Sequence, residues 1–157
     1  MTPSLRWNIV PGSDGIGLSL IGAIDESTDF AALVGQIPNG RLVRIDLSGI
    51  ERISSVGVRS WINFMEKLML QEMQVELHGC SVAIVRQLSM ISQFRGHGTV
   101  RSVFAPYYCA DCNTEQLRLI DLHAEVAPQL HKPVACPTCG ADLELDEEES
   151  LYATLQT

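Results

Sequence analysis

The sequence has few basic and few aromatic residues, and it has no long uninterrupted hydrophobic stretch. Lysine and arginine number 11 of 157 residues against 19 aspartates and glutamates, and aromatic residues make up 6%. A net charge of −8 disfavours nucleic acid as a partner, because phosphate contacts need lysine and arginine. No run approaches the roughly 18 apolar residues of a membrane span, and the N-terminal segment lacks the features of a signal peptide. We therefore expect a cytoplasmic protein with no membrane partner.

The excess of acidic over basic residues lies entirely in the last third of the chain. Residues 1–104 contain nine basic and nine acidic residues, whereas residues 105–157 contain two basic and ten acidic ones. This break in charge coincides with a break in composition near Pro106. The sequence therefore predicts two units, residues 1–104 and residues 105–157.

The first unit has the hydrophobic pattern of an α/β fold. Apolar residues recur at spacings of three and four in the expected helices, and the turn at 11–15 is typical of a hairpin. The strand at 41–47 is expected to be central, because it is apolar on both faces. The expected elements are strands at 6–10, 15–25, 41–47, 74–80 and within 96–106, and helices at 26–37, 55–71 and 81–91. Their order predicts helices packed on a mixed sheet.

A short polar turn is expected between the strand ending at Asp46-Leu47-Ser48 and the helix beginning near Ser54 and Ser55. One of these two serines should cap the helix, which contributes about 1 kcal/mol. Ser27 or Thr28 should cap the first helix in the same way.

Four of the five cysteines form two CxxC pairs, Cys109 with Cys112 and Cys136 with Cys139, separated by 23 residues. Each CxxC turn brings two sulfurs together, so two turns can complete a tetrahedral site. The separation slightly exceeds the usual range of about 15–20 residues, which a longer β-hairpin accommodates. Gly140 follows the second turn, where a positive φ angle is easy for glycine.

The alternatives to zinc at these cysteines are a redox or disulfide pair and an iron site. Disulfides are rare in the cytoplasm, and a redox CxxC belongs at a helix start. Four thiolates leave no open coordination position, so we predict a structural Zn²⁺ in a C-terminal zinc ribbon with an acidic tail. The metal should supply much of the ribbon's folding energy. His123 and His131 are interpreted as ordinary surface or packing residues, and Cys80 as a buried small hydrophobe.

The segment 42–65, LVRIDLSGIERISSVGVRSWINFM, resembles the central signature of STAS domains, the fold of bacterial anti-sigma factor antagonists. In that family a hydrophobic strand ends in Asp-Leu-Ser, and a motif of the form Asp-Ser-Ser/Thr-Gly opens the second helix. The strand end LIGAID and the order of elements also agree. The resemblance covers about residues 6 to 104 and implies a STAS-like mixed sheet with helices.

The match to the family's motif breaks down at one position. Ser54 and Ser55 fall on the family's Asp and first Ser, and Gly57 falls on its Gly. Val56 falls on the phosphorylated Ser/Thr and cannot accept a phosphate. The resemblance therefore implies that this switch is missing, unless a neighbouring serine replaces it. Ser55 is the candidate phosphorylation site in that case.

The resemblance implies a non-enzymatic protein–protein interaction module in bacterial signalling and transcription regulation. Its expected partner is a serine-kinase-type anti-sigma factor or a related regulatory scaffold. The expected partner-binding residues lie in the turn after the strand and on the outward face of the following helix: Ser48, Ser54, Ser55, Val56, Gly57, Arg59, Ser60 and Asn63.

Two other classes of function stay open. One is a nucleic-acid-associated transcription regulator that uses the zinc ribbon, which the acidic balance disfavours. The other is a homodimeric scaffold, in which the apolar segment 117–122 covers a sheet edge. An enzyme is not expected and no catalytic residue is assigned, because His78 and His97 are isolated and no nucleophile–base pair stands out.

Overall fold

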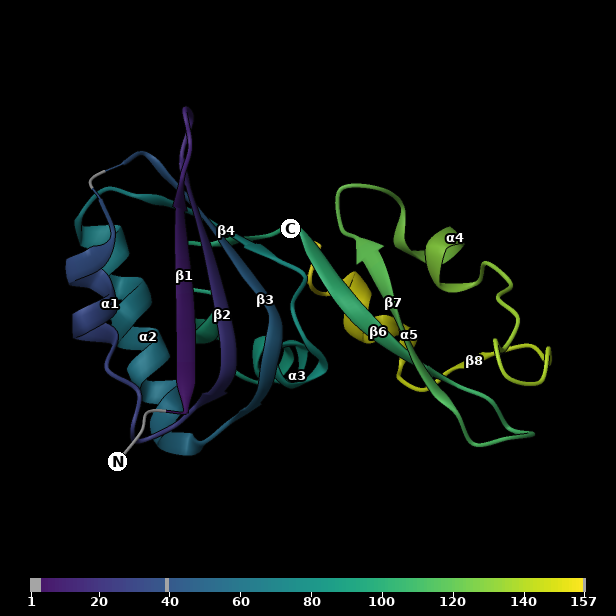
Figure 1. Ribbon diagram of the computed structural model, residues 1–157. Helices are drawn as coiled ribbons and strands as arrows, with labels where there is room; N and C mark the ends of the chain where they lie inside the picture. The colour runs from purple at the N-terminus through teal and green to yellow at the C-terminus, as the bar shows by residue number, and fades with distance from the viewer. Residues whose placement is uncertain (1–3, 39, 157) are drawn as a thin grey trace.

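A computed structural model describes residues 4–38 and 40–156. The chain forms two sheets with five α-helices and one short 3₁₀ helix among these residues (Figure 1). The elements are β1 (Leu5–Pro11), β2 (Ile16–Ile24), α1 (Phe30–Gln36), β3 (Leu42–Ile53), α2 (Ser55–Leu70), β4 (Gln74–His78), α3 (Val82–Met90), η1 (Ser92–Phe94), β5 (Thr99–Val100), β6 (Ser102–Tyr108), β7 (Glu115–Asp121), α4 (Val126–Leu130), β8 (Glu144–Leu145) and α5 (Glu149–Ala153).

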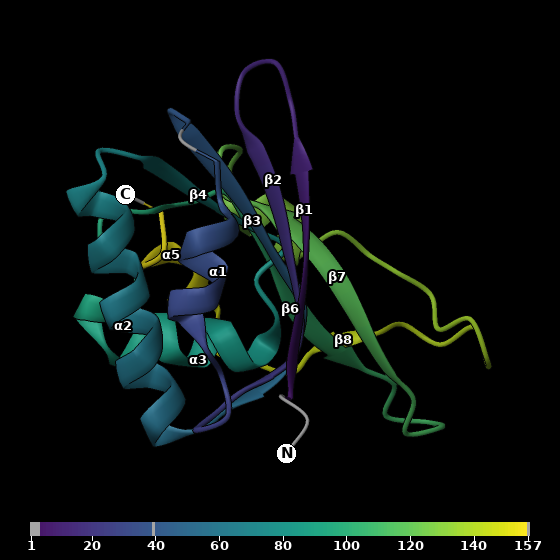
Figure 2. The same ribbon diagram turned by 60° about the vertical axis from the view of Figure 1, so that its left-hand side comes forward.

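The larger sheet has the order β1-β2-β3-β4-β5, antiparallel between β1 and β2 and parallel elsewhere. Helices α1, α2 and α3 cover one face of it (Figure 2). This confirms the predicted mixed sheet with helices and the central place of the strand that starts at Leu42. The predicted hairpin is also confirmed, with the Gly12 N–H donating to the Gly15 carbonyl at 2.8 Å.

The core between the helices and the larger sheet is centred on aromatic side chains. Trp61 is fully buried, and its indole N–H donates to the Phe94 carbonyl at 2.9 Å. The Phe30 and Phe64 rings stack at 4.7 Å between centroids, which ties α1 to α2. Because the one polar atom of the indole is satisfied, the helix layer closes without an unpaired buried donor at this point.

Two predictions about local structure are wrong. Strand β3 does not end near Ser48 but runs to Ile53, because Ile50 and Ile53 continue the parallel pairing with Gly22 and Ile24 after a register shift. The predicted polar turn at this place is therefore strand. The cap of α1 is Asp29, whose carboxylate accepts from the Ala32 N–H, because Ser27 and Thr28 are bonded to Asp25.

The smaller sheet is antiparallel, with the order β7-β6-β8. Its strand β6 also pairs with Cys80 at the end of the larger sheet: the Cys80 N–H donates to the Ser102 carbonyl, and the Phe104 N–H donates to the Cys80 carbonyl. The division predicted after residue 104 therefore falls inside a strand that contacts both sheets.

The sequence pattern did not predict helices α4 and α5. Helix α5 begins at Glu149, the last residue of the acidic stretch 146–149, and it buries Tyr152 in the same core as the side chains of the larger sheet. Leu155 is buried beside it, and its carbonyl accepts from the Arg95 guanidinium at 2.9 Å. The C-terminal segment thus packs back onto the first half of the chain. No helix in the described ranges is both long and apolar enough to cross a membrane.

Gly57 lets the first turn of α2 lie close to the end of β2. A Cβ atom added there would lie 2.2 Å from the Ile24 carbonyl oxygen, which is backbone and cannot rotate away. We expect Gly57→Ala to lower the free energy of unfolding by about 2–3 kcal/mol, measured by urea denaturation.

Gly35 provides the matched control, because it also lies in a helix and a Cβ there would meet nothing within 4 Å. Gly35→Ala should raise the free energy of unfolding by up to about 1 kcal/mol. Equal effects of the two substitutions would contradict the packing account of Gly57.

Candidate functional site

The two CxxC turns have the same backbone geometry. The N–H of the first cysteine bonds to the carbonyl five residues on, from Cys109 to Thr114 at 2.9 Å and from Cys136 to Ala141 at 2.7 Å. The carbonyl of the first cysteine accepts from the residue after the second, which is Asn113 in one turn and Gly140 in the other. Both of these residues have positive φ, at 59° and 79°. The chain therefore builds the same sulfur-presenting turn twice, as metal knuckles require.

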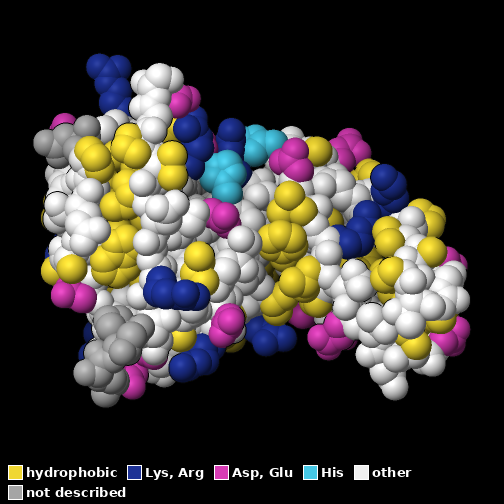
Figure 3. All heavy atoms as spheres, viewed as in Figure 1, with side chains coloured by type: hydrophobic (Ala, Val, Ile, Leu, Met, Phe, Trp, Pro, Cys, Tyr) yellow, Lys and Arg dark blue, Asp and Glu magenta, His cyan; other side chains and the backbone are white. Residues whose placement is uncertain are grey.

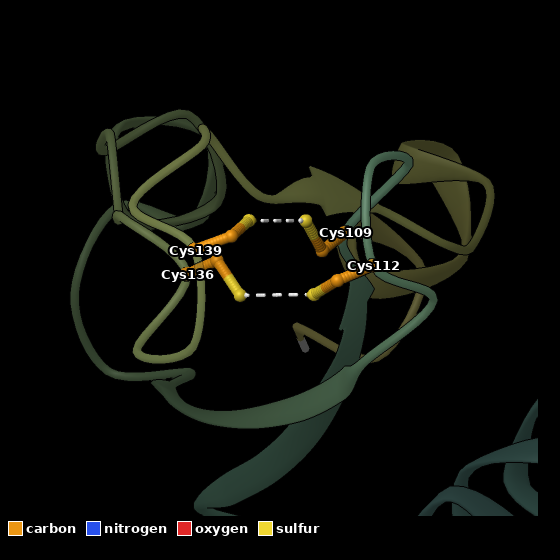
Figure 4. A group of neighbouring side chains, drawn as sticks. All are labelled: Cys109, Cys112, Cys136 and Cys139. Carbon is orange, nitrogen blue, oxygen red and sulfur yellow. Dashed lines mark hydrogen bonds between the residues drawn. The ribbon is translucent and has the colours of Figure 1, made fainter.

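The four sulfur atoms of these turns converge on one point (Figure 4). All lie within 4.8 Å of one another, with 3.3 Å between Cys109 and Cys139 and 3.5 Å between Cys112 and Cys136. Tetrahedral zinc with bonds of about 2.3 Å would place its sulfurs about 3.8 Å apart. The arrangement fits a four-coordinate metal with little adjustment, and none of the five cysteines is in a disulfide.

The backbone around the second turn favours thiolate. The N–H groups of Cys139 and Thr138 bond to the Cys136 sulfur and lower its pKa to about 6. The Ala141 N–H acts in the same direction on Cys139, but the neighbouring sulfurs of the cluster and burial outweigh it and raise the pKa of Cys139 to about 12. Without a cation the four sulfurs cannot all be ionised so close together, and a divalent metal removes that conflict.

The histidines of the C-terminal part lie outside this cluster. His131 bonds to the Glu149 carboxylate at 2.8 Å, and His123 contacts the Arg101 guanidinium. Cys80 is fully buried at the end of the larger sheet, and burial raises the pKa of its thiol to about 12. These placements agree with the sequence-based interpretation of all three residues.

The start of α2 is a second candidate site. Ser54 is the cap, and its hydroxyl accepts from the Gly57 N–H at 3.0 Å. Its own N–H donates to the Ile24 carbonyl, so Ser54 also joins the helix to the end of β2. Gly57 is buried beneath the first turn and is placed there by packing. Ser54 and Gly57 therefore hold the first turn of α2 in position beneath its exposed side chains.

The side chains that face solvent at this end of α2 are Ser55, Val56, Arg59 and Asn63. Val56 is 55% exposed, although its side chain is aliphatic. The Ser60 hydroxyl is partly buried because it donates to the Val56 carbonyl at 3.1 Å. The predicted outward face of α2 is therefore largely present, with an apolar side chain at its tip.

A groove of about 250 Å³ lies beside this surface, between α2 and α3. Ser54, Ser55 and Val58 line it from one side, and Gln87 and Ile91 line it from the other. The groove and Val56 together offer a small mixed surface with an apolar centre, of the kind that a partner's side chain can occupy.

Ser48 does not belong to this group. It lies in β3 on the face of the larger sheet opposite the helices, close to Gly79, and its N–H bonds to the Asp46 carboxylate at 2.9 Å. The sequence placed it in the same turn as Ser54 because it did not predict the extension of β3.

Asp25 is a residue of this region whose role the sequence did not indicate. It is nearly buried at the end of β2, and hydrogen bonds from the Ser27 hydroxyl and N–H lower its pKa. Its second oxygen lies 3.9 Å from the Arg52 guanidinium. The ionised carboxylate fixes the β2–α1 turn beside the first turn of α2. The sequence feature that could have indicated this role is a polar residue directly after a buried strand.

Comparisons with known proteins give only distant likenesses. No protein-family model and no curated protein matches the sequence. A solved structure of an anti-sigma factor antagonist from Mycobacterium paratuberculosis is 23% identical over 62% of this chain and 85% of its own, with a TM-score of 0.45. Two structures of Mglu, one of them in its native form in 4.3 M NaCl, are 26% and 19% identical over 45% and 47% of this chain, with TM-scores of 0.40 and 0.37. The chain spans 18% and 26% of those two structures, and likenesses at this level carry no functional argument.

The four-cysteine cluster should bind one metal ion per chain. We expect the purified chain to hold one zinc ion, measured by elemental analysis, and Cys112→Ser to lose it. Chelation should lower the thermal midpoint, because the two knuckles then lose the bond that joins them. Cys80→Ala is the control and should keep the metal, although it removes a buried sulfur. Retention of zinc by Cys112→Ser would contradict the four-cysteine site.

Proposed function

We propose that this protein is a non-enzymatic, cytoplasmic protein–protein interaction module of bacterial signalling and transcription regulation. Residues 1–104 would form a STAS-type unit related to anti-sigma factor antagonists, and residues 105–157 a structural zinc ribbon with an acidic tail. The observation that carries the proposal is the exposed Val56 in the first turn of α2, beside a groove, at the motif position where the family has its phosphorylated residue.

The docking surface in this proposal consists of the first turns of α2 and the groove against α3. Val56 supplies the apolar contact, and Arg59 and Asn63 supply polar contacts at its rim, since all three face solvent on one side of the helix. The expected partner is a serine-kinase-type anti-sigma factor. Gly57 and Asp25 hold the surface in shape and do not need to touch the partner, whereas Ser54 both caps the helix and lines the groove.

Regulation would differ from that of a phosphorylated antagonist. A phosphate adds about two negative charges at a helix N-terminus and thereby changes which partner fits. Val56 cannot carry that group, and the Ser54 hydroxyl is engaged as the cap. Phosphorylation at this position would therefore not control the binding of the partner. Ser55 is the exposed hydroxyl that could restore a switch.

The absence of catalysis is supported by the surroundings of the histidines. The imidazole nitrogens of His78 and His131 bond to the carboxylates of Glu76 and Glu149, and His97 bonds to the Met73 carbonyl. His123 contacts Arg101. None of these partners is a nucleophile, so no histidine is placed to activate a serine or cysteine.

A negative charge at Val56 should mimic the phosphorylated state. We expect Val56→Asp to weaken capture of the anti-sigma factor by at least about tenfold, because a carboxylate replaces the apolar contact. Stability should stay equal or rise by about 0.3–1 kcal/mol, because an acid at a helix N-terminus is favourable. The measurement is pull-down of the tagged chain from its native lysate, followed by titration of the purified partner.

Leu70→Asp is the matched control, since Leu70 is 78% exposed at the opposite end of the same helix. It should leave capture unchanged. Equal binding by Val56→Asp and the unmodified chain would overturn the proposed surface. Stoichiometric phosphate on Ser55 in cells would overturn the absence of control by phosphorylation and leave the surface intact.

A further inference from the structure

The smaller sheet has one covered and one uncovered face. Helix α4 lies on the inner face, where Val126 and Leu130 are buried and the Tyr107 hydroxyl donates to the Leu130 carbonyl. On the outer face Leu117 and Leu119 of β7 are 58% and 57% exposed. They pair across the ladder with two half-buried residues of β6, Pro106 and Phe104. We call these four residues the β6–β7 patch, and Figure 3 shows hydrophobic side chains gathered over these strands.

Strand β7 is also an edge strand, because no strand of the described residues lies beyond it. The bonds from Leu122 to Arg101 and from Cys109 to Thr114 show that even-numbered residues direct their backbone groups toward β6. By the alternation of an antiparallel ladder, Leu117 and Leu119 direct theirs to the open edge. The strand thus offers backbone donors and acceptors at the residues whose side chains form the patch.

Asp121 shows that this edge accepts a pairing partner. The Gln129 side chain receives a hydrogen bond from the Asp121 N–H at 2.8 Å and donates to the Asp121 carbonyl at 2.7 Å. These two bonds take the place of the two backbone hydrogen bonds that a neighbouring strand would form with Asp121. Gln129 covers the edge at Asp121, and the stretch from Glu115 to Leu119 lies before it.

The charged side chains around the patch are mainly acidic, and Arg101, just before β6, is engaged by the Glu76 carboxylate and by His123. Glu115 and Asp121 are exposed at the two ends of β7, and Glu144 accepts from the Tyr108 hydroxyl on the same face. Asp146 lies beside Pro106, to whose carbonyl its N–H donates. The single basic residue within β6, β7 and β8 is Arg118, which lies over the Tyr107 ring on the inner face. An apolar centre with carboxylates at both ends of its edge strand fits a partner with aliphatic side chains flanked by basic ones.

We propose that the β7 edge and the β6–β7 patch form a second protein-docking surface, which binds an extended segment of a protein partner as an added strand. The segment would place aliphatic side chains opposite Leu117 and Leu119, with Lys or Arg opposite Glu115 and Asp121. Backbone bonds at the edge supply part of the affinity, and the alternating side chains supply the specificity. This surface is independent of the start of α2.

A second copy of the chain fits this edge less well. Pairing two β7 strands about a two-fold axis with Leu117 opposite Leu119 would set Glu115 opposite Asp121 of the other copy. Two carboxylates directly opposite each other destabilise a strand pair. Each copy also carries a net charge of −8. A partner with basic residues removes both conflicts.

The test uses the full zinc-loaded chain and two labelled seven-residue peptides in fluorescence anisotropy. Both peptides have valine at the third and fifth positions and threonine at the fourth. They differ only at the first and seventh positions, which are Lys and Arg in one peptide and Glu in the other. We expect the basic peptide to bind at least about tenfold more tightly, and its binding to weaken as salt is raised.

Three variants locate the site. Leu119→Lys should weaken binding of the basic peptide at least about tenfold, whereas Leu70→Lys, at a still more exposed leucine on α2, should not change it. Leu119→Pro removes an outward N–H and leaves the β6 ladder in place, so it should cause a similar loss. Zinc content and the thermal midpoint verify folding. Glu115→Lys should reduce the preference for the basic peptide, because Asp121 is then the only acid at an end of β7, whereas a misfolded chain would lose binding of both peptides.

Each contrary result overturns the proposal in a distinct way. Binding to Leu119→Pro as tight as to the unmodified chain would mean that a ligand lies on the face without strand pairing. A dimer in sedimentation that Leu119→Lys dissociates would assign the edge to a second copy. No binding of the basic peptide, or equal losses in Leu119→Lys and Leu70→Lys, would remove the surface altogether.

Discussion

Strand β6 is the element on which the rest of the structure depends, because it is bonded on both sides. One edge pairs with β7 along its whole length, and the other pairs with Cys80 at its start and β8 at its end. Its buried side chains, Val103, Ala105 and Tyr107, belong to the same core as the larger sheet. The two halves of the chain therefore share one hydrophobic core, and a change in one half should be felt in the other.

The four-cysteine cluster closes the end of this strand. Cys109 follows β6 directly, and the first knuckle leads into β7, while the second leads into β8. All three strands of the smaller sheet thus meet at the four sulfurs. A sheet this small buries little apolar surface, so a metal ion held by the four sulfurs would add the stability that packing alone does not supply.

The two proposed docking surfaces differ in chemistry. The start of α2 offers Val56 with Arg59 and Asn63 nearby, over a groove. The β6–β7 patch offers two leucines bordered by carboxylates. One lies on a helix that covers the larger sheet and the other lies on the smaller sheet, and they would select different partners. An adaptor that joins two proteins needs this arrangement, and the shared core would hold the two surfaces at a fixed geometry.

The sequence by itself determined the features that depend on local spacing. The hairpin, the helix from Ser55, the capping by one of two serines and the pairing of the CxxC motifs all follow from short-range patterns, because turns, caps and knuckles are built within a few residues. Only the tertiary structure decided that β3 continues past Ser48, because that extension depends on pairing with β2. It also decided that Tyr152 lies in the core and that β6 joins the two halves, because long-range burial and strand pairing leave no signal in a short stretch of sequence.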